Sequence, residues 1–522
     1  MRNDVVVIGA GHNGLIAAAF LAKAGLKTLV LERTDRVGGG VRMSEIAPGF
    51  RCPALAHTAA VEPAIVRELA LERHGLEILQ PEAHACAPTL DGRALTLWRD
   101  PTRALREIDA FSPRDATRYV PFLDSVRRIS GVLAAALESL PPSFDAPTAG
   151  DLFAGLKLGR AFRALGKTDA HRLMRWIPMP VSDLVAEWFE SEPLRATVAA
   201  GGVLGSFLGP RSAGSTLVLL LLGATHAHPI ANGWFPRSGV GAVSDALAEA
   251  ARQAGVIIRT DAAVERIEVT ADAASAVTLA SGESIDARAI VSSVDPKHTL
   301  LKMIDPIHLA PEFVRRVQNI RARGTLAKVN YAVSALPGVA NQSPAALSGR
   351  IRLAPNLDTI ERAFDVAKYG GFSHEPWVEL TIPSVTDPAL APNGAHVVSA
   401  YVQYAPYALR GSTWDDERER LGEVATRTIG RYARGFESTI LARQVITPLD
   451  LEREYGFTGG HIFHGELALD QLFIGRPVLG WTRYATPIRN LYLCGAGTHS
   501  GLNGSSGARV AKEILRDFKG SS

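Results

Sequence analysis

The chain has 522 residues, of which 47% are hydrophobic and 21% charged, and its formal net charge is +3. A chain of this length predicts two or three domains, and the composition is ordinary for a soluble globular protein. The small net charge, together with the lack of a basic run interleaved with aromatic residues, argues against a nucleic-acid partner. Because Cys52, Cys86 and Cys494 form neither a CxxC pair nor a metal-ligand cluster, we expect a reducing compartment and no bound metal.

Apolar runs in the chain are short. The longest, residues 217–224, cannot span a bilayer, and it predicts either a buried core helix or the lining of an apolar substrate cavity. The first predicted strand begins at Asp4, which leaves no room before it for a signal or transit peptide. We therefore expect a cytoplasmic protein, with the mitochondrial matrix an option for eukaryotic relatives alone. Peripheral membrane contact and the oligomeric state stay open.

The first forty residues carry the most informative pattern. Residues 4–8 (DVVVI) predict a buried parallel strand, and the glycine turn GAGHNG at 9–14 follows at once. Residues 15–24 predict an alanine-rich helix, and residues 27–31 predict a second strand with Glu32 at its carboxyl end. Strand, glycine turn, helix, strand and terminal acid together predict a dinucleotide-binding unit.

Each residue of this fingerprint has a physical task. Gly9 allows the tight turn, Gly11 lets the backbone approach a pyrophosphate, and Gly14 lets the helix pack closely on the strand. The free N–H groups and the positive end of the helix dipole face the phosphates. Glu32 can accept hydrogen bonds from an adenosine ribose.

The rest of the chain alternates between parallel strand-and-helix segments of this kind and segments that are mainly helical or mainly strands. A second glycine cluster, Gly38-Gly39-Gly40, follows the second strand, as expected where a longer cofactor passes close to the backbone. Residues from about 102 to 200 have helical periodicity, as at 119–137 and 181–189, and predict a helical insertion. The parallel pattern returns with a helix at 242–254 and strands at 256–259, 263–269, 276–279 and 289–292.

Two further stretches complete the organisation. Residues from about 310 to 455 predict a strand-rich platform, with strands at 327–333, 377–382 and 396–402 and a helix at 415–431. The chain then ends with a strand at 490–494, a polar glycine loop at 495–504 and a helix at 505–518. Because no further strand follows, this last loop is expected to complete the first nucleotide unit, which makes that domain discontinuous.

In these motifs the chain resembles FAD-dependent oxidoreductases of the phytoene-desaturase and carotenoid-isomerase type. The matching segments are residues 9–15 (GAGHNGL), 30–39, 239–250 (GVGAVSDALAEA), 289–296 (AIVSSVDP), 461–476 (HIFHGELALDQLFIGR) and 491–498 (LYLCGAGT). The resemblance implies an α/β fold with a discontinuous Rossmann-like FAD-binding domain of glutathione-reductase-type βαβ topology, expected at residues 1–100, 235–305 and 460–522. An α+β substrate or cap domain with the helical insertion is expected at residues 101–234 and 306–459.

The resemblance also implies which residues contact FAD. The backbone of Val264 is expected at the adenine, and the loop from Gly495 beside the ribityl chain and isoalloxazine. The full set is Gly9, Ala10, Gly11, Asn13, Gly14, Glu32, Arg33, Gly38, Gly39, Val264, Gly495, Ala496, Asn503 and Gly504. One departure concerns position 40, where related enzymes carry an arginine and this chain has Gly40; Arg42 is a candidate substitute.

The expected activity is oxidation–reduction at the flavin, of the dehydrogenase, desaturase or isomerase type, on an apolar substrate such as an isoprenoid or polyene. Two alternatives are a flavin-containing regulatory or interaction protein with little turnover, and a flavin amine oxidase. The catalytic residues are unknown. His499 and Tyr484 are weak candidates near the flavin, as are Trp481 and Asn503, and each has a structural explanation as well. Further residues considered are Lys328 and Asn330, which could face the substrate, and His461 and His464, whose spacing resembles a metal pair only superficially.

Overall fold

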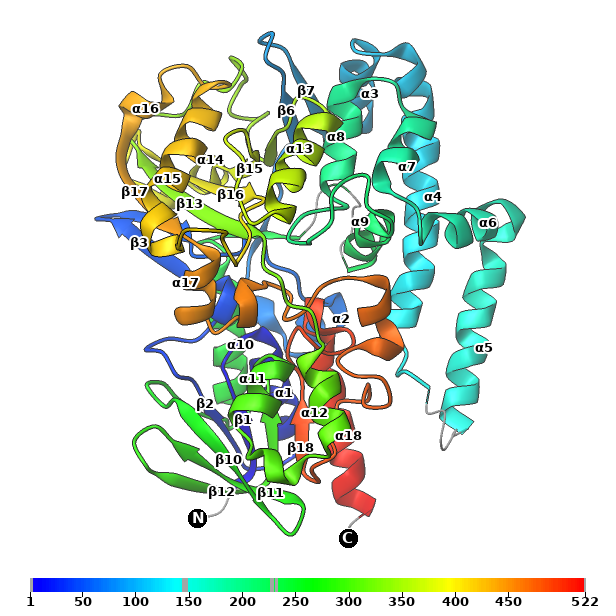
Figure 1. Ribbon diagram of the computed structural model, residues 1–522, viewed down its shortest axis with the longest axis vertical. Coiled ribbons are helices and arrows are strands. Elements are labelled where there is room, and N and C mark those ends of the chain that lie inside the picture. Colours follow the sequence, from blue (N-terminus) through cyan, green and yellow to red (C-terminus); the bar gives the residue numbers. More distant parts are fainter. Residues whose placement is uncertain (1–2, 143–148, 226–229, 231–232, 521–522) are drawn as a thin grey trace.

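In the computed structural model, which describes residues 3–142, 149–225, 230 and 233–520, two seven-stranded sheets organise the chain. Both ends of the chain lie at the bottom of Figure 1, beside the lower sheet, and the upper sheet lies above it with a row of helices along one side. Segments distant in sequence alternate between these two halves. The mixed α/β architecture expected from the sequence is confirmed.

The lower sheet is built from three separate stretches of the chain. β1 (Asn3–Ile8) pairs in parallel with β2 (Thr28–Leu31) and β12 (Ser284–Ser292). β9 (Ile257–Arg259) extends the sheet beyond β2, and β18 (Leu491–Leu493) pairs in parallel with β12. The antiparallel strands β10 (Val264–Thr270) and β11 (Ala273–Leu279) continue from β12 as a meander. The last strand thus completes a sheet that the first strand begins, which is the predicted discontinuity.

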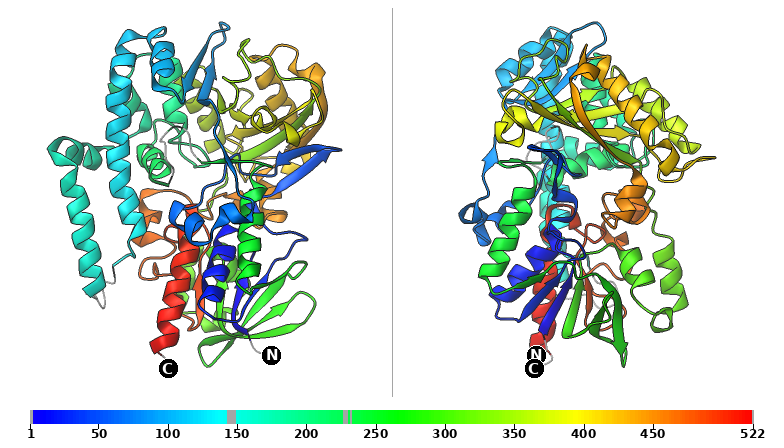
Figure 2. Two further views of the ribbon diagram at one scale, coloured as in Figure 1. Left: turned by 180° about the vertical axis from the view of Figure 1, so that it is seen from behind. Right: turned by 90° about the vertical axis from the view of Figure 1, so that its left-hand side faces the viewer.

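Helices cover both faces of the lower sheet. On one face α1 (His12–Lys23) packs between α10 (Gly241–Gln253) and α18 (Ser505–Gly520). Figure 2 shows these three helices side by side. The other face is covered by α11 (Pro296–Lys302) and α12 (Pro311–Gln318). α12 was expected in the substrate domain, but Phe313 and Val317 pack into the core cluster of the lower sheet.

The upper sheet has the strand order β17-β13-β16-β15-β14-β6-β7. Its strands are β17 (Ile440–Ile446), β13 (Leu326–Val333), β16 (His396–Gln403), β15 (Trp377–Thr381), β14 (Arg350–Leu353), β6 (Ala83–Pro88) and β7 (Ala94–Trp98). β6 and β7 correct the expected boundary at residue 100, because β6 pairs in parallel with β14 and so belongs to this sheet. Helices α13 (Leu357–Lys368) and α15 (Trp414–Gly430) pack on the sheet.

The helical insertion forms the side of the molecule at the right of Figure 1. It consists of α3 (Pro101–Asp109), α4 (Pro113–Glu138), α5 (Ala149–Ala164), α6 (Gly166–Trp176), α7 (Val181–Trp188), α8 (Glu192–Ala200) and α9 (Ser215–Thr225). α9 contains the longest apolar run, and Leu217 to Leu222 are buried in the core cluster that this insertion shares with β6 and β7. The buried-core explanation of the run is therefore confirmed, and the same helix end also contributes Leu222 and Thr225 to the lining of a cavity.

Short elements connect these layers. They are β3 (Met43–Ala47), β4 (Phe50–Pro53), α2 (Pro63–Glu68), β5 (Ile78–Leu79), β8 (Phe235–Pro236), α14 (Pro383–Thr386), α16 (Phe436–Thr439) and α17 (Pro448–Arg453). The strands β3 and β4 form a hairpin that packs on the upper sheet although its residues follow β2 of the lower sheet. Among the residues described, no helix is both long and apolar enough to cross a membrane.

Candidate active site

A cavity of about 480 Å³ lies where the two sheets meet. Its lower wall is formed at the carboxyl ends of β1 and β2, by Ile8, Gly9 and Gly11 and by Leu31 to Arg33. Its upper wall includes Arg350 on β14 and Tyr401 on β16. The cavity therefore joins the predicted nucleotide unit to the predicted substrate platform.

The three fingerprint glycines occupy different environments. Gly9 has a φ of +91°, and a Cβ there would lie 2.5 Å from the Ser293 hydroxyl oxygen. A Cβ on Gly14 would lie 2.2 Å from the Gly9 carbonyl oxygen, so this glycine lets α1 pack against the turn. A Cβ on Gly11 would meet no atom within 4 Å, and Gly11 lines the cavity. The turn thus leaves open the position where a pyrophosphate approaches the backbone.

Glu32 is held against this turn. Its Oε2 accepts a hydrogen bond of 2.9 Å from the backbone N–H of Ala10, and its Oε1 accepts from the N–H and hydroxyl of Thr34. The side chain is buried and lines the cavity beside Val264. A carboxylate offers about four acceptor positions, so capacity for a ribose remains.

The predicted cofactor residues divide into two groups. Those that line the cavity are Gly9, Gly11, Asn13, Glu32, Arg33, Gly39, Val264 and Ala496. Those that lie outside its lining are Ala10, Gly14, Gly38, Gly495, Asn503 and Gly504. Arg42, the candidate substitute for a family arginine, also lies outside the lining, because its guanidinium stacks over Tyr455 and donates to the Thr34 hydroxyl.

The terminal glycine loop closes the cavity from a segment almost 500 residues beyond the first turn. Asn13 connects the two, because its amide donates to the Gly501 carbonyl at 2.8 Å and accepts from the Ser506 hydroxyl at 2.8 Å. Gly501 and Leu502 line the cavity. Asn503 instead faces a second, smaller cavity and accepts a hydrogen bond from the backbone N–H of Ser505.

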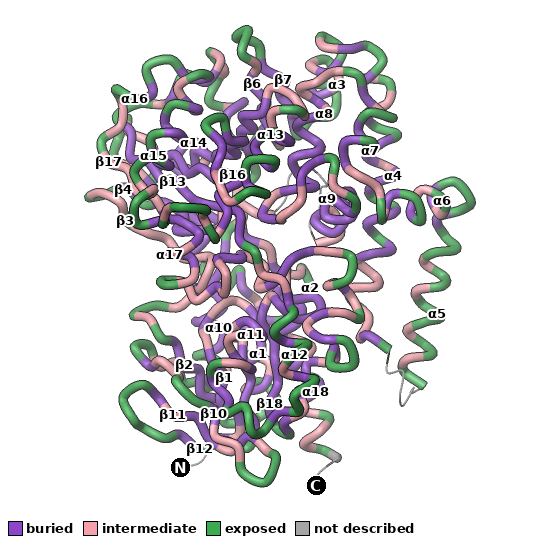
Figure 3. Tube along the Cα trace, viewed as in Figure 1, coloured by how far each residue is buried: buried purple, intermediate pink, exposed green. Residues whose placement is uncertain are grey.

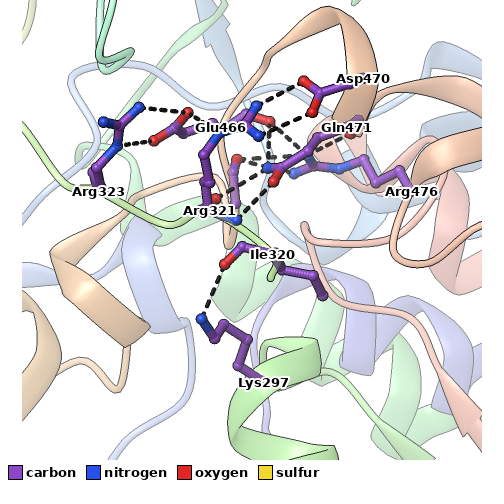
Figure 4. Close-up of polar contacts among 9 residues, drawn as sticks. Lys297, Ile320, Arg321, Arg323, Glu466, Asp470, Gln471 and Arg476 are labelled. Carbon is purple, nitrogen blue, oxygen red and sulfur yellow. Dashed lines mark hydrogen bonds and ion pairs between the residues drawn. The ribbon is translucent and has the colours of Figure 1, made fainter. Parts of the chain in front are cut away.

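Arg476, for which the sequence predicted no role of its own, positions this loop. Its guanidinium is buried and donates to the Ala496 carbonyl at 2.9 Å, as well as to carbonyls in residues 463–466. Figure 4 shows the surrounding network, in which Glu466 accepts from Arg321 at 3.1 Å and from Arg323 at 2.7 Å. The segment 461–476 therefore ties the strand-rich half of the chain to the loop beside the cavity.

The weak catalytic candidates near the loop do not line the cavity. His499 contacts the Ser139 carbonyl at the end of α4 through Nε2, and burial lowers its pKa to about 4. Tyr484 is buried in the core of the lower half and donates to the His499 carbonyl. Trp481 packs edge-on against Phe313 at the surface. These contacts are of the kind that the structural explanation of each residue predicts.

Lys328 and Asn330 lie on β13 and donate to the segment after β4 and to the last residue of β4, respectively. The Lys328 ammonium donates to the Leu55 carbonyl and lies 4.7 Å from the Tyr401 ring centroid. Burial holds the pKa of Lys328 well below its usual value. Asn330 donates to the Pro53 carbonyl and accepts from the Ser399 hydroxyl. Lys328 therefore supports the cavity wall that Leu55 and Tyr401 form, whereas Asn330 connects Pro53 and Ser399, which lie outside the lining.

The upper end of the cavity contains a buried polar cluster that no sequence motif indicated. Glu379 receives hydrogen bonds from Arg350 and Arg352, and although burial works to raise the pKa of this carboxyl, the two guanidiniums hold it well below its usual range. His57 stacks on Tyr401 with ring centroids 3.7 Å apart, and its Nδ1 lies 3.9 Å from a Glu379 carboxylate oxygen.

His57 itself is buried and lines the cavity. Burial holds its pKa well below the usual value, and among the described residues neither ring nitrogen has a hydrogen-bond partner. Nδ1 lies 3.9 Å from Glu379, whereas Nε2 has no such neighbouring carboxylate among the ion pairs of the described residues. In the sequence His57 is a lone histidine in an irregular segment after a glycine cluster. Such histidines are too common for this pattern to have identified His57 as a site residue.

The other histidines near the cavity do not form a metal site. His464 lines the cavity and His461 lies behind it; burial lowers their pKa values to about 4 and about 3. Within the described part of the chain, no group of three or more histidine, cysteine or acidic side chains has a geometry that could hold a metal ion.

Comparison with known proteins identifies the family. Residues 7–69 match the NAD(P)-binding Rossmann-like domain, and residues 199–515 match the flavin containing amine oxidoreductases. The chain is 34% identical to rat (Rattus norvegicus) pyridine nucleotide-disulfide oxidoreductase domain-containing protein 2, over 99% of this chain and 94% of the rat protein. The chain belongs to the flavin containing amine oxidoreductase family. This flavoprotein is an FAD-dependent oxidoreductase of the amine oxidase and phytoene desaturase superfamily.

More distant relatives of this flavoprotein include enzymes named for terpenoid substrates. It is 26% identical to a limonene dehydrogenase component of Castellaniella defragrans, over 99% of this chain and 95% of the relative. It is 27% identical to the lycopene-forming phytoene desaturase of Pantoea ananas, over 95% of this chain and 94% of the relative. The fold is similar to that of putrescine oxidase, with a TM-score of 0.58 at 16% identity over 99% of both chains.

The cavity fits the FAD of this family. The open space at Gly11 faces the end of α1, where free N–H groups and the helix dipole favour phosphate. Glu32 and Val264 would hold the adenosine end, and Ala496 and Gly501 the flavin end. When bound, FAD supplies the acceptor for hydride or electrons.

The disulfide in the name of the rat relative has no counterpart here. Cys52, Cys86 and Cys494 are all free and buried. Burial raises the pKa of Cys52 and of Cys86 to about 12 and also raises that of Cys494. Thiols this weakly acidic do not supply a reactive thiolate at neutral pH.

Proposed function

We propose that this flavoprotein is a dehydrogenase, desaturase or isomerase that acts on a small apolar substrate of the isoprenoid or polyene class. The observation that carries the proposal is the continuity of one cavity from Gly11 to an apolar region. Side chains of this region come from the helical insertion, from residues 462–463 and from the terminal loop: Leu204, Leu222, Ile462, Phe463 and Leu502. The terpenoid substrates named for two relatives have the same apolar character.

In this reaction we assign different roles to the cofactor and to two side chains. Forming a carbon–carbon double bond removes a hydride and a proton from neighbouring carbons, and FAD supplies the hydride acceptor when bound. We assign the proton to His57 Nε2, because His57 lines the cavity and this buried nitrogen lacks another partner among the described residues. Glu379 lies within 3.9 Å of Nδ1 and stabilises the imidazolium that results.

An amine substrate fits this cavity less well. The acid of the buried cluster is Glu379, whereas Arg350 and Arg352 are both cationic, so these three side chains carry an excess positive charge. A protonated amine would be repelled by Arg350, which lines the cavity. The terminal loop contributes Leu502 to the lining rather than an aromatic ring for an amine cage.

Anaerobic reduction of the purified yellow protein separates these activities. We expect terpenoid or polyene substrates to bleach the flavin absorbance, whereas primary and secondary amines leave it unchanged. Bleaching by amines alone would overturn the proposal in favour of amine oxidation. A protein that holds FAD but is bleached by neither class fits the low-turnover alternative. Reoxidation by oxygen, a quinone or NAD(P)+ then identifies the electron acceptor.

A further inference from the structure

One helix of the insertion presents apolar side chains to solvent. α5 forms the outer edge of the molecule in Figure 1 and in the left view of Figure 2. Leu152, Phe153 and Leu156 on this helix are 70%, 73% and 65% exposed. Figure 3 shows the helix as exposed or intermediate along its length. Large side chains exposed this far, and in one group, mark an interaction surface.

The exposure is not explained by a loose helix end. Asp151 in the first turn of α5 forms an ion pair with Arg483, which also donates to the Pro141 carbonyl at 2.8 Å. Leu158 and Ala161, on the inner side of α5, pack against the core of the insertion. The helix therefore uses one face for packing and holds Leu152, Phe153 and Leu156 outward.

Basic residues follow the apolar group along α5 and into the first turn of α6, where Lys167 lies. Lys157 forms an exposed ion pair with Glu138 at 3.5 Å. For Arg160, Arg163 and Lys167, also exposed, no ion pair is found in the described part of the chain. Apart from the paired Asp151, residues 149–167 contain no acid. The surface thus combines an apolar end with uncompensated positive charge.

We propose that α5 docks this flavoprotein on an anionic lipid surface. Apolar side chains on a basic helix insert at the boundary of headgroups and acyl chains, and the cations bind anionic headgroups. A second copy of the chain fits less well, because Arg160, Arg163 and Lys167 would face the same charges. Three side chains, at roughly 250 Å² or less each, also fall short of the about 800 Å² per partner that a stable dimer buries.

This inference does not depend on the proposed reaction, but it is consistent with it. An apolar substrate partitions into lipid, so an enzyme at the membrane surface meets it at high local concentration. Vesicle binding needs no turnover, so failure of the proposed reaction and failure of this inference are separate results.

Vesicle flotation of the FAD-loaded full chain tests the inference. We expect binding to phosphatidylcholine vesicles that contain phosphatidylglycerol, and weaker binding to phosphatidylcholine alone. The variant L152Q/F153Q/L156Q should lower the partition coefficient on anionic vesicles at least about tenfold. For the variant R160Q/R163Q/K167Q, the partition coefficient on anionic vesicles should fall about fivefold for each charge removed. Added salt should change the binding of this variant little.

A matched control carries the same number of apolar-to-glutamine changes elsewhere on the surface. Ile307, Tyr369 and Leu441 are 82%, 74% and 60% exposed, so I307Q/Y369Q/L441Q should bind vesicles like the unchanged protein. Equal loss in the control, or no binding of the unchanged protein to anionic vesicles, overturns the inference. Light scattering tests the alternative that the surface binds a second copy of the chain. If L152Q/F153Q/L156Q converts a dimer into a monomer, the surface is a self-interface and the lipid assignment is wrong. FAD content and thermal unfolding report whether each variant is folded.

Discussion

The carboxylate of Glu32 accepts a hydrogen bond of 2.9 Å from the backbone N–H of Ala10, 22 residues earlier. The same carboxylate accepts from Thr34 on the other side. The acid that the fingerprint reserves for the ribose therefore also stabilises the glycine turn that receives the pyrophosphate. Cofactor binding and the stability of the turn depend on one side chain.

Replacing Glu32 is expected to affect both properties. Glu32→Ala leaves the buried N–H of Ala10 without its acceptor, which costs about 1–3 kcal/mol of unfolding free energy. It also removes the acceptors at the adenosine end, so the variant should purify with reduced FAD. Denaturant unfolding and the flavin absorbance measure the two effects. Glu72→Ala, at an exposed position, should change the unfolding free energy by less than about 0.5 kcal/mol; an equally small change for Glu32→Ala would contradict the prediction.

The open space at Gly11 predicts a variant that folds but loses its cofactor. In Gly11→Val the new side chain meets no protein atom within 4 Å of its Cβ and occupies the path of the pyrophosphate. We expect FAD affinity to fall at least about tenfold, or about 1.4 kcal/mol, with little loss of secondary structure. Gly131→Val is the matched control, since a Cβ there also meets no atom but lies on α4, outside the cavity lining. Full FAD occupancy in Gly11→Val would falsify the assignment of this turn.

Much of the lower half could be predicted from the sequence, because its signals are local. The strand at 4–8, the glycine turn and the acid at 32 follow one another within forty residues, and β1, α1 and β2 formed as expected. The return of the chain through β12 and β18 was also predicted, since each strand is a short apolar run beside a glycine or a polar turn.

The upper half was predicted less completely, because its contacts are not local. β14 alternates polar and apolar residues over only four positions and β17 has no strong alternation, so strand pairing rather than propensity makes them strands. His57, Arg350 and Glu379 are far apart in sequence and meet only when β14, β15 and the segment after β4 pack together. Conversely, His499 and Tyr484 are close to the glycine loop in sequence, yet they face away from the cavity, toward α4 and the lower core.

The buried ion pairs of Glu379 predict a large stability effect. Glu379→Gln keeps the shape of the side chain but leaves Arg350 and Arg352 without a buried counter-charge, which should cost about 3–5 kcal/mol. Glu375→Gln removes an ion pair with Arg431 at 2.8 Å that is exposed on both sides, and should cost less than about 1 kcal/mol. Urea unfolding of the two variants compares them directly. Similar losses of unfolding free energy in the two variants would show that burial does not make the Glu379 ion pairs more important for stability than an exposed pair.

Buried histidines predict how stability depends on pH. Burial lowers the pKa of His12, His464 and His499 to about 4 and of His461 to about 3, and lowers that of His57 well below its usual value. Unfolding restores a pKa of about 6.5, so below that pH the unfolded chain binds more protons and the folded state loses stability. Each group contributes up to about 1.4 kcal/mol per pH unit. The melting temperature should therefore fall steadily from about pH 7 to about pH 5; a constant value over this range would show that these histidines are protonated in the folded protein.

His57 carries the sharpest prediction for the reaction. His57→Phe keeps a ring to stack on Tyr401 but removes both nitrogens, so FAD content and melting temperature should stay close to those of the unchanged protein. If Nε2 takes the proton, the rate of flavin reduction by a substrate should fall about 10²- to 10⁴-fold.

Tyr401→Phe is the control for this experiment. It removes the hydroxyl that accepts from the His57 backbone N–H at 3.0 Å but leaves the His57 ring and its stacking partner in place. We expect a reduction rate within about tenfold of the unchanged protein, since one neutral hydrogen bond contributes about 1 kcal/mol. The pH dependence adds an independent readout: because burial keeps His57 unprotonated, the rate should stay constant as the pH falls through about 6.5, where a solvent-exposed histidine base would lose activity. Equal rates for His57→Phe and Tyr401→Phe would assign the proton to another group and leave His57 as part of the cavity wall.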